Sequence, residues 1–291
     1  MKYNVFTLQP QIFDSFLTTS LIARGLNKEI ISVNRVDWRE EYGVGGYKQV
    51  DDKPFGGGSG MVIQPGPIYN ALKNYNAVST LYKKPETVLE FDKILPNNSV
   101  FFDQWSQNPG HFRSITISLT PRGFPINQKI VEWLAREFET VSILCGRYEG
   151  FDHRVDSLVD LELSIGDFIL NGGEIASMCL IESISRLLPG FVTKSENVHH
   201  DSFSTGLNFY HEQSQYAIGK KVLSQKTDIP QKTLYTNLFN DEKWLKNIMP
   251  NIEHPQYTRP EVWENMKVPG ILLNGNHKLI QDWRLNWWAQ V

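Results

Sequence analysis

The sequence predicts an α/β protein built on a mostly parallel sheet. Short apolar, β-branched runs alternate with helical segments along the first two thirds of the chain, which is typical of strands connected by helices. Glycine-containing turns follow three of the predicted strands, at 120–123, 146–150 and 165–173. Because ligands of such sheets bind beyond the carboxyl ends of the strands, we expect these turns to converge on a binding site.

Each element follows from a local pattern. Apolar and β-branched runs predict strands at 3–8, 30–36, 114–119, 141–144 and 161–164. Apolar side chains at helical spacing predict helices at 11–22, starting over 67–72, at 128–138 and at 176–187. Pro10 ends the first strand, and Pro189-Gly190 closes the last of these helices. Residues 82–112 are polar and irregular, so we expect an insertion or flap there.

Composition divides the chain into two parts. We expect a first domain at 1–191, a polar linker at 192–201 and a smaller helical domain at 202–291. The net charge of −3 argues against a protein that coats nucleic acid. The last part, however, carries ten Lys and Arg against eight Asp and Glu, so it is the better candidate for contact with a polyanion. Its lysine cluster is Lys220, Lys221, Lys226 and Lys232, which a solvated basic surface explains equally well.

Several classes are disfavoured by simple counts. No run of eighteen apolar residues exists, so no membrane span is expected, and the first residues lack the apolar core of a signal peptide. The two cysteines, Cys145 and Cys179, both lie in apolar runs, which predicts small buried core residues rather than a disulfide or a nucleophile. These features suit a reducing cytoplasm.

The glycine run at 56–60 first suggests a phosphate loop. It lacks the Gly-Lys-Ser/Thr ending of that loop and the spacing of a dinucleotide fold, which also argues against a nicotinamide-dependent dehydrogenase. The nearby carboxylates Asp51 and Asp52 would repel a phosphate. We therefore expect a close backbone approach to a neutral base or a partner chain, with a flexible loop as the alternative.

Three other polar motifs each allow two interpretations. The turn at 146–150 mixes both charges between glycines, as a salt-bridged structural turn or a ligand site would. Gly172-Gly173-Glu174 opens a helix, where backbone N–H groups meet ligands, but Glu174 could equally be a partner of the helix dipole. The histidines of 199–201 lack metal-ligand spacing and fit an ordinary polar linker better than a metal site.

Several longer phrases together resemble the bacterial tRNA (guanine-N1)-methyltransferase family of the TrmD type. They occur in the family's order and cover both ends of the chain. The phrases are DDKPFGGGSGM (51–61), CGRYEGFDHRV (145–155), SIGDFILNGGE (164–174), SRLLPG (185–190), DSF (201–203), PQYTRP (255–260), GNH (275–277) and WR (283–284).

The resemblance implies a SPOUT-class methyltransferase, in which an α/β sheet carries a deep trefoil knot. Such enzymes are homodimers with active sites at the interface. They transfer a methyl group from S-adenosylmethionine to N1 of the guanosine 3′ of the anticodon, at position 37 of tRNA. The resemblance also implies dependence on Mg²⁺, without naming its ligands, and a tRNA substrate rather than a membrane partner.

The resemblance assigns site residues by matching positions. The catalytic arginine matches Arg186, the general base matches Asp201, and Asp51 and Gly60 match positions near the target guanine. The chemistry agrees, because N1 must lose its proton to a base, and a guanidinium stabilises the charge that develops on O6. The residues expected to bind S-adenosylmethionine are Leu119, Thr120, Pro121, Gly123, Gly146, Glu149, Ser164, Ile165, Gly166, Phe168, Leu170, Gly172 and Gly173.

Two alternatives and some departures stay open at this point. Another SPOUT methyltransferase acting on ribosomal RNA would share the core, though it would lack the phrases at 51–58 and 255–260. A non-catalytic RNA-binding relative would have lost Asp201 or Arg186, and both are present. Segments at 83–112 and 211–253 are longer than is usual in the family, which leaves the surface that contacts tRNA open.

Overall fold

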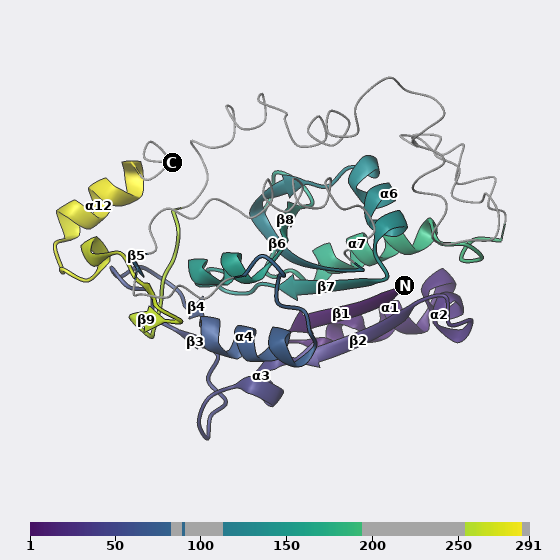
Figure 1. Cartoon of the computed structure of the whole chain (residues 1–291), viewed down its shortest axis with the longest axis horizontal. Helices are drawn as coiled ribbons and strands as arrows, with labels where there is room; N and C mark the ends of the chain where they lie inside the picture. Colours follow the sequence, from purple (N-terminus) through teal and green to yellow (C-terminus); the bar gives the residue numbers. More distant parts are fainter. Residues whose placement is uncertain (83–88, 91–112, 194–253, 287–291) are drawn as a thin grey trace.

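The computed structural model describes residues 1–82, 89–90, 113–193 and 254–286. Its centre is a five-stranded sheet of order β2-β1-β7-β6-β8, in which all neighbouring strands run parallel (Figure 1). This confirms the predicted α/β fold with a parallel sheet. The strands are β1 (Lys2–Thr7), β2 (Ser32–Asp37), β6 (Ser114–Pro125), β7 (Thr140–Cys145) and β8 (Leu161–Ser164).

Helices cover both faces of the sheet. Neighbouring strand residues point to opposite faces, so Val5 joins one hydrophobic cluster and Phe6 the other. The cluster of Val5 includes side chains of η1 (Pro10–Phe13), α2 (Ser20–Asn27), α6 (Gln128–Glu137) and α7 (Glu174–Arg186). The cluster of Phe6 includes side chains of α3 (Trp38–Tyr42), α4 (Pro65–Asn74) and η2 (His153–Leu158). The result is a three-layer arrangement that leaves the ends of the strands accessible.

Two predicted boundaries were wrong. The helix expected over 11–22 is interrupted, because Thr19 is extended between α1 (Asp14–Thr18) and α2. The strand expected to end at 119 continues to Pro125 as β6, because Leu119 and Phe124 both pair with Leu163 of β8. The intervening residues 120–123 therefore bulge out of the strand instead of forming the turn that ends it.

The prediction for the cysteines was half right. Cys145, at the end of β7, is buried, and burial raises the pKa of its thiol. Cys179 is exposed, so the prediction of a buried core residue was wrong there. The physical reason is the orientation of α7, whose opposite side packs on the sheet, while Ile175 and Arg186 on the side of Cys179 are exposed as well.

The described part of the last segment, 254–286, contains little helix before its end. It comprises β9 (Val262–Trp263), β10 (Met266–Lys267), η4 (Gly270–Leu272) and α12 (His277–Asn286), and β10 pairs with β5 (Leu89–Glu90). Buried Arg154 ties this segment to the rest by donating to Asp152 Oδ1 at 2.8 Å, to Thr258 O at 2.8 Å and to Met266 O at 3.2 Å.

Some expectations fall outside the described residues. These are the linker from 194 onwards, Asp201, the lysine cluster and the segments at 91–112 and 211–253. The division into domains therefore stays a prediction. Within the ranges that the structure describes, no helix combines the length and hydropathy that crossing a membrane requires.

Candidate functional site

The three glycine-containing segments converge as expected, at the carboxyl ends of β7 and β8 and at the bulge of β6, which begins where the pairing of β6 with β7 ends. They surround one cavity of about 1060 Å³, at the upper end of the usual range for ligand pockets. Of the residues expected to bind S-adenosylmethionine, all except Gly123 line it: Leu119, Thr120, Pro121, Gly146, Glu149, Ser164, Ile165, Gly166, Phe168, Leu170, Gly172 and Gly173.

Gly123 does not line this cavity, and its place among the residues that bind S-adenosylmethionine stays a prediction. It ends the bulge of β6 and packs directly on the backbone of β8, where a Cβ atom would lie 2.4 Å from Leu163 N and 2.6 Å from Glu162 C. Only a residue without a side chain allows two backbones to cross so closely. The contact of Gly123 with β8 thus keeps the neighbouring residues 119–121, which line the cavity, close to that strand.

An ion pair joins two walls of the cavity. Arg147, after β7, donates through Nε to Glu174 Oε1 at 3.1 Å, and its Nη2 lies 2.9 Å from Glu174 Oε2. Glu174, the first residue of α7, is buried and also accepts from Thr7 Oγ1 at 2.8 Å. A backbone bond from Gly173 N to Gly146 O, at 2.9 Å, runs alongside. The charged turn at 146–150 is therefore, in part, the salt-bridged turn that one interpretation expected.

The segment after Gly146 also reaches the glycine run. Glu149 N donates to Met61 O at 3.0 Å, and the Glu149 carboxylate lies so close to Gly60 that a Cβ there would be 2.2 Å from Oε1. Gly60 has φ +78°, which L side chains rarely adopt. The residue expected near the guanine and a residue expected near the cofactor are thus direct neighbours.

The second residue expected near the guanine, Asp51, is linked to the same turn through Arg39. Asp51 lies in β3 (Asp51–Asp52), which pairs with β4 (Val62–Ile63). Arg39 Nη2 lies 3.4 Å from Asp51 Oδ1 and donates to Tyr148 Oη at 3.0 Å. The structure therefore brings Asp51, Gly60 and the turn at 146–150 together on one side of the cavity.

Sequence reasoning missed a charged cluster beneath the cavity. Arg122, in the bulge of β6, donates through Nη2 to Asp156 Oδ2 at 2.9 Å and to Glu162 Oε1 at 3.2 Å. Burial, together with the charge of Asp156, raises the pKa of Glu162 to about 7, although Arg122 opposes the shift. His153 Nδ1 lies 2.7 Å from Asp156 Oδ2. These residues come from three elements, so no local pattern in the sequence links them. The one signal in the sequence was that Arg122 stands between Pro121 and Gly123, two residues already expected at the site.

Among the lining residues without an assigned role, four come from the end of β1 and from the last segment of the chain. Leu8 and Gln9 follow β1, and His254 and Gln256 come from the last segment. Gln9 accepts a hydrogen bond from Arg147 Nη2 at 3.1 Å. Leu8 and Gln9 reach the cavity because β1 lies next to β7 in the sheet. His254 and Gln256 reach it because the last segment packs near His153, about a hundred residues earlier, whose N donates to Gln256 O.

The two residues expected to be catalytic are not brought together by the described structure. Arg186 is the last residue of α7, is exposed and does not line the cavity. Asp201 lies outside the described residues. Within those residues, no group of three or more His, Cys, Asp or Glu side chains could hold a metal ion, so no ligand of Mg²⁺ is assigned.

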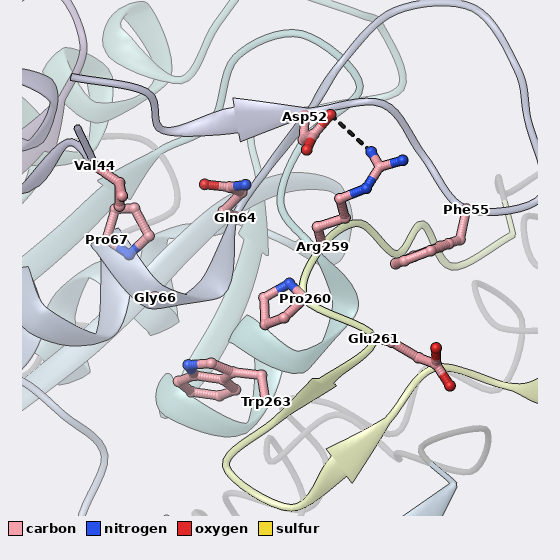
Figure 2. A pocket seen from close by; sticks show the side chains of 10 residues that line it. All are labelled: Val44, Asp52, Phe55, Gln64, Gly66, Pro67, Arg259, Pro260, Glu261 and Trp263. Carbon is pink, nitrogen blue, oxygen red and sulfur yellow. Dashed lines mark hydrogen bonds and ion pairs between the residues drawn. The ribbon is translucent and has the colours of Figure 1, made fainter. Parts of the chain in front are cut away.

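A second, shallower cavity of about 720 Å³ lies at the other end of the glycine run (Figure 2). It is bounded by 52–55, by the start of α4 and by residues 259–263. Figure 2 shows the Arg259 guanidinium pointing at Asp52, an ion pair of 3.0 Å. Most of its walls are apolar or already paired, so it lacks the convergent polar groups of the larger cavity.

Comparison with known proteins identifies the family of this chain. The family model described as tRNA (Guanine-1)-methyltransferase TrmD matches residues 1–108, 100–249 and 236–290. The tRNA (guanine-N(1)-)-methyltransferase of Latilactobacillus sakei subsp. sakei is 34% identical over 98% of this chain and 84% of its own. The protein of the same description from Prochlorococcus marinus is 35% identical over 97% of this chain and 82% of its own.

Among solved structures, the tRNA (m1G37) methyltransferase from Aquifex aeolicus is similar, with 28% identity and a TM-score of 0.49 over 100% of this chain and 89% of that one. The family match extends over almost the whole sequence, including the segments 146–151 and 164–173 that line the larger cavity. The chain belongs to the tRNA (guanine-1)-methyltransferase TrmD family.

Proposed function

We propose that this chain transfers the methyl group of S-adenosylmethionine to N1 of the guanosine 3′ of the anticodon, position 37 of tRNA. The family is one of tRNA (guanine-N1)-methyltransferases. The observation that carries the proposal is the convergence of the phrases at 145–155 and 164–174 on a single cavity, with Asp51 and Gly60 linked to the turn at 146–150. Since its macromolecular substrate is tRNA, we place the reaction in the cytoplasm.

The larger cavity suits S-adenosylmethionine chemically. Leu119, Leu163 and Ile165 offer apolar surface for an adenine ring, whereas Glu149 and Asp167 offer carboxylates to a cationic ligand. The turns contribute backbone that can approach a ligand closely, because Gly166 has φ +151° and Gly150 has φ +89°. When bound there, S-adenosylmethionine supplies an electrophilic methyl group on its sulfonium.

The proposed chemistry assigns two tasks to side chains of this chain. N1 of guanine carries a proton at neutral pH, so a carboxylate must accept it, and we assign this task to Asp201. Charge then grows on O6, where a guanidinium donates charge-assisted hydrogen bonds, and we assign this task to Arg186. The neighbourhood of Gly60 and Glu149 would hold the guanine facing the cavity.

A homodimer would explain why Arg186 lies away from the cavity of its own chain. An apolar patch next to the cavity supports this part of the proposal, since Phe168 is 54% exposed, Ile169 76%, Leu170 37% and Ile175 51%. Exposed apolar clusters of this kind mark sites of protein association. In the dimer we propose, each active site takes the general base from one chain and the arginine from the other.

The trefoil knot of the SPOUT class also belongs to the proposal. It is supported by the close crossing of Gly123 over the backbone of Glu162 and Leu163 and by the bulge at 120–123. Chains seldom thread themselves. Two backbones can cross this closely because glycine, which has no Cβ atom, stands at the contact.

Methyl transfer from labelled S-adenosylmethionine to tRNA transcripts tests the function directly. The transcripts are a matched pair with guanosine or adenosine 3′ of the anticodon. We expect label only in the first, recovered as 1-methylguanosine after nuclease digestion. Label in both transcripts, or in ribosomal RNA instead, would favour the alternative of a different RNA methyltransferase. Binding of tRNA without transfer would favour the non-catalytic alternative.

A further inference from the structure

The last segment of the chain is fastened to the start of the glycine run. Phe55 N donates to Tyr257 O at 2.7 Å, and Thr258 Oγ1 donates to Lys53 O at 2.7 Å. Figure 2 shows Arg259 between Asp52, its ion-pair partner, and the ring of Phe55, whose centroid lies 5.7 Å from the guanidinium carbon. Residues 52–55 are thereby held on one side by residues 257–259.

The centre of the glycine run is held by a second arginine. Arg284, in the last turn of α12, donates through Nη2 to Gly57 O at 2.6 Å and to Gly56 O at 3.3 Å. Both glycines have positive φ, +80° and +76°, so their peptide groups have an orientation that few other residues allow. A single guanidinium that binds two successive carbonyls fixes both peptide planes at once.

The loop is also shaped to receive this helix. A Cβ on Gly56 would lie 3.1 Å from Leu272 Cδ2 and 3.4 Å from Arg284 Nη2, so the bare backbone is in packing contact. Phe55 packs against the hydrophobic cluster of Tyr257, Val268, Leu272 and Ile280. The conformation of the glycine run thus depends on residues more than two hundred positions away.

The loop leads straight to the larger cavity. Three residues after Gly57, Gly60 lies against the Glu149 carboxylate that lines that cavity. A change in the peptide planes at 56 and 57 therefore moves the point where the loop meets the expected guanine site. In reactions between bound groups, a displacement of about 1 Å costs on the order of 10²-fold in rate.

We propose that Arg284 is a positioning residue for methyl transfer, which orients the glycine run so that Gly60 presents the target guanine to the cavity. The inference rests on the proposed function and assigns a task to the last segment beyond general affinity for RNA. Arg284 lies in the more basic part of the chain, yet its Nη2 binds the Gly56 and Gly57 carbonyls, not a surface open to phosphate.

The test compares Arg284→Ala and Arg284→Lys with a matched control, Lys278→Ala, which removes a positive charge from an exposed position of the same helix. The measurements are the single-turnover rate of methyl transfer at saturating S-adenosylmethionine and tRNA, the affinity for each, and the salt dependence of tRNA binding. For Arg284→Ala we expect a fall in rate on the order of 10²-fold. Affinity for S-adenosylmethionine and the salt slope should stay at the wild-type values.

The other two variants separate positioning from charge and from folding. Lysine can donate to one carbonyl, so Arg284→Lys should recover part of the rate, whereas Lys278→Ala should keep all of it. In Arg284→Ala, the slope of log tRNA affinity against log salt concentration could instead fall in magnitude by about 0.9, or about 0.7 for a single-stranded contact. If the rate of methyl transfer at saturating substrates were unchanged at the same time, Arg284 would be a phosphate contact and the proposal would be overturned. Full activity of Arg284→Ala would overturn it too. A wild-type chain that transfers no methyl group would instead refute the proposed function.

Discussion

A methyl group at one glycine of the larger cavity should weaken the binding of S-adenosylmethionine without unfolding the protein. Gly173 lies just before α7, and a Cβ there would be 2.7 Å from Cys145 Cα and 3.1 Å from Gly146 N. Both are backbone atoms, which have no rotamer to change. The φ of Gly173 is −77°, an angle that alanine adopts without strain, so the effect of Gly173→Ala is steric alone.

The contact distances give the size of the effect. Ordinary contacts of a Cβ begin at 3.4 Å, so the start of α7 must move away from β7 by roughly the difference from 2.7 Å. Overpacking of this kind costs about 1–3 kcal/mol. S-adenosylmethionine binding requires the start of α7 to return to its wild-type position, so this free energy is subtracted from the free energy of binding. The affinity should therefore fall by roughly 5-fold to 150-fold.

Isothermal titration of S-adenosylmethionine and thermal unfolding of the same sample measure the two quantities. Gly66→Ala is the matched control, because its added Cβ meets no atom within 4 Å beyond its chain neighbours and its own helix. We expect it to change the unfolding free energy by less than about 1 kcal/mol and to leave binding unchanged. Wild-type affinity in Gly173→Ala would refute both the steric reasoning and the assignment of this cavity to S-adenosylmethionine.

Three further outcomes are expected. Asp201→Ala should keep S-adenosylmethionine binding but slow methyl transfer by roughly 10²–10⁴-fold; normal turnover would remove Asp201 from the mechanism. Arg186→Ala subunits mixed with Asp201→Ala subunits should regain activity at one site of each heterodimer, and inactivity of proven heterodimers would place both groups on one chain. Burial, opposed by hydrogen bonds from Ser79 and Thr116, raises the pKa of Asp160 from 3.8 to about 6. Stability from this carboxyl is therefore complete below about pH 4 and is lost as the pH rises through 6. Relative to wild type, Asp160→Asn should gain about 2 kcal/mol of unfolding free energy between pH 4 and pH 7. Urea unfolding at both values checks this, and a difference independent of pH would contradict it.

Local sequence patterns were enough to place most strands and helices. The β-branched runs at 114–119 and 141–144 and the helical spacing over 128–138 depend only on near neighbours, and the structure has elements at all three places. The convergence of the glycine-containing segments also followed, because parallel strands bring their carboxyl ends to one edge of the sheet. The family itself was evident from phrases such as the one at 145–155, and the comparisons agree.

Side-chain partners and exposure needed the tertiary structure. Cys145 and Cys179 lie in similar apolar runs, but only the packing of α7 decides that the second is exposed. Arg147 and Glu174 were visible as charged residues, yet their ion pair depends on the order of strands in the sheet. The continuation of β6 beyond Leu119 likewise depends on β8, which no local pattern encodes.

The α/β class, the family and the turns that line the larger cavity could be predicted from the amino-acid sequence, because they depend on periodicity and on short phrases of neighbouring residues. The bonds from Arg284 to the carbonyls of Gly56 and Gly57, and those from Arg122 to Asp156 and Glu162, become visible once the chain is folded. Such contacts join residues far apart in the chain, and their free energy depends on burial and distance in three dimensions.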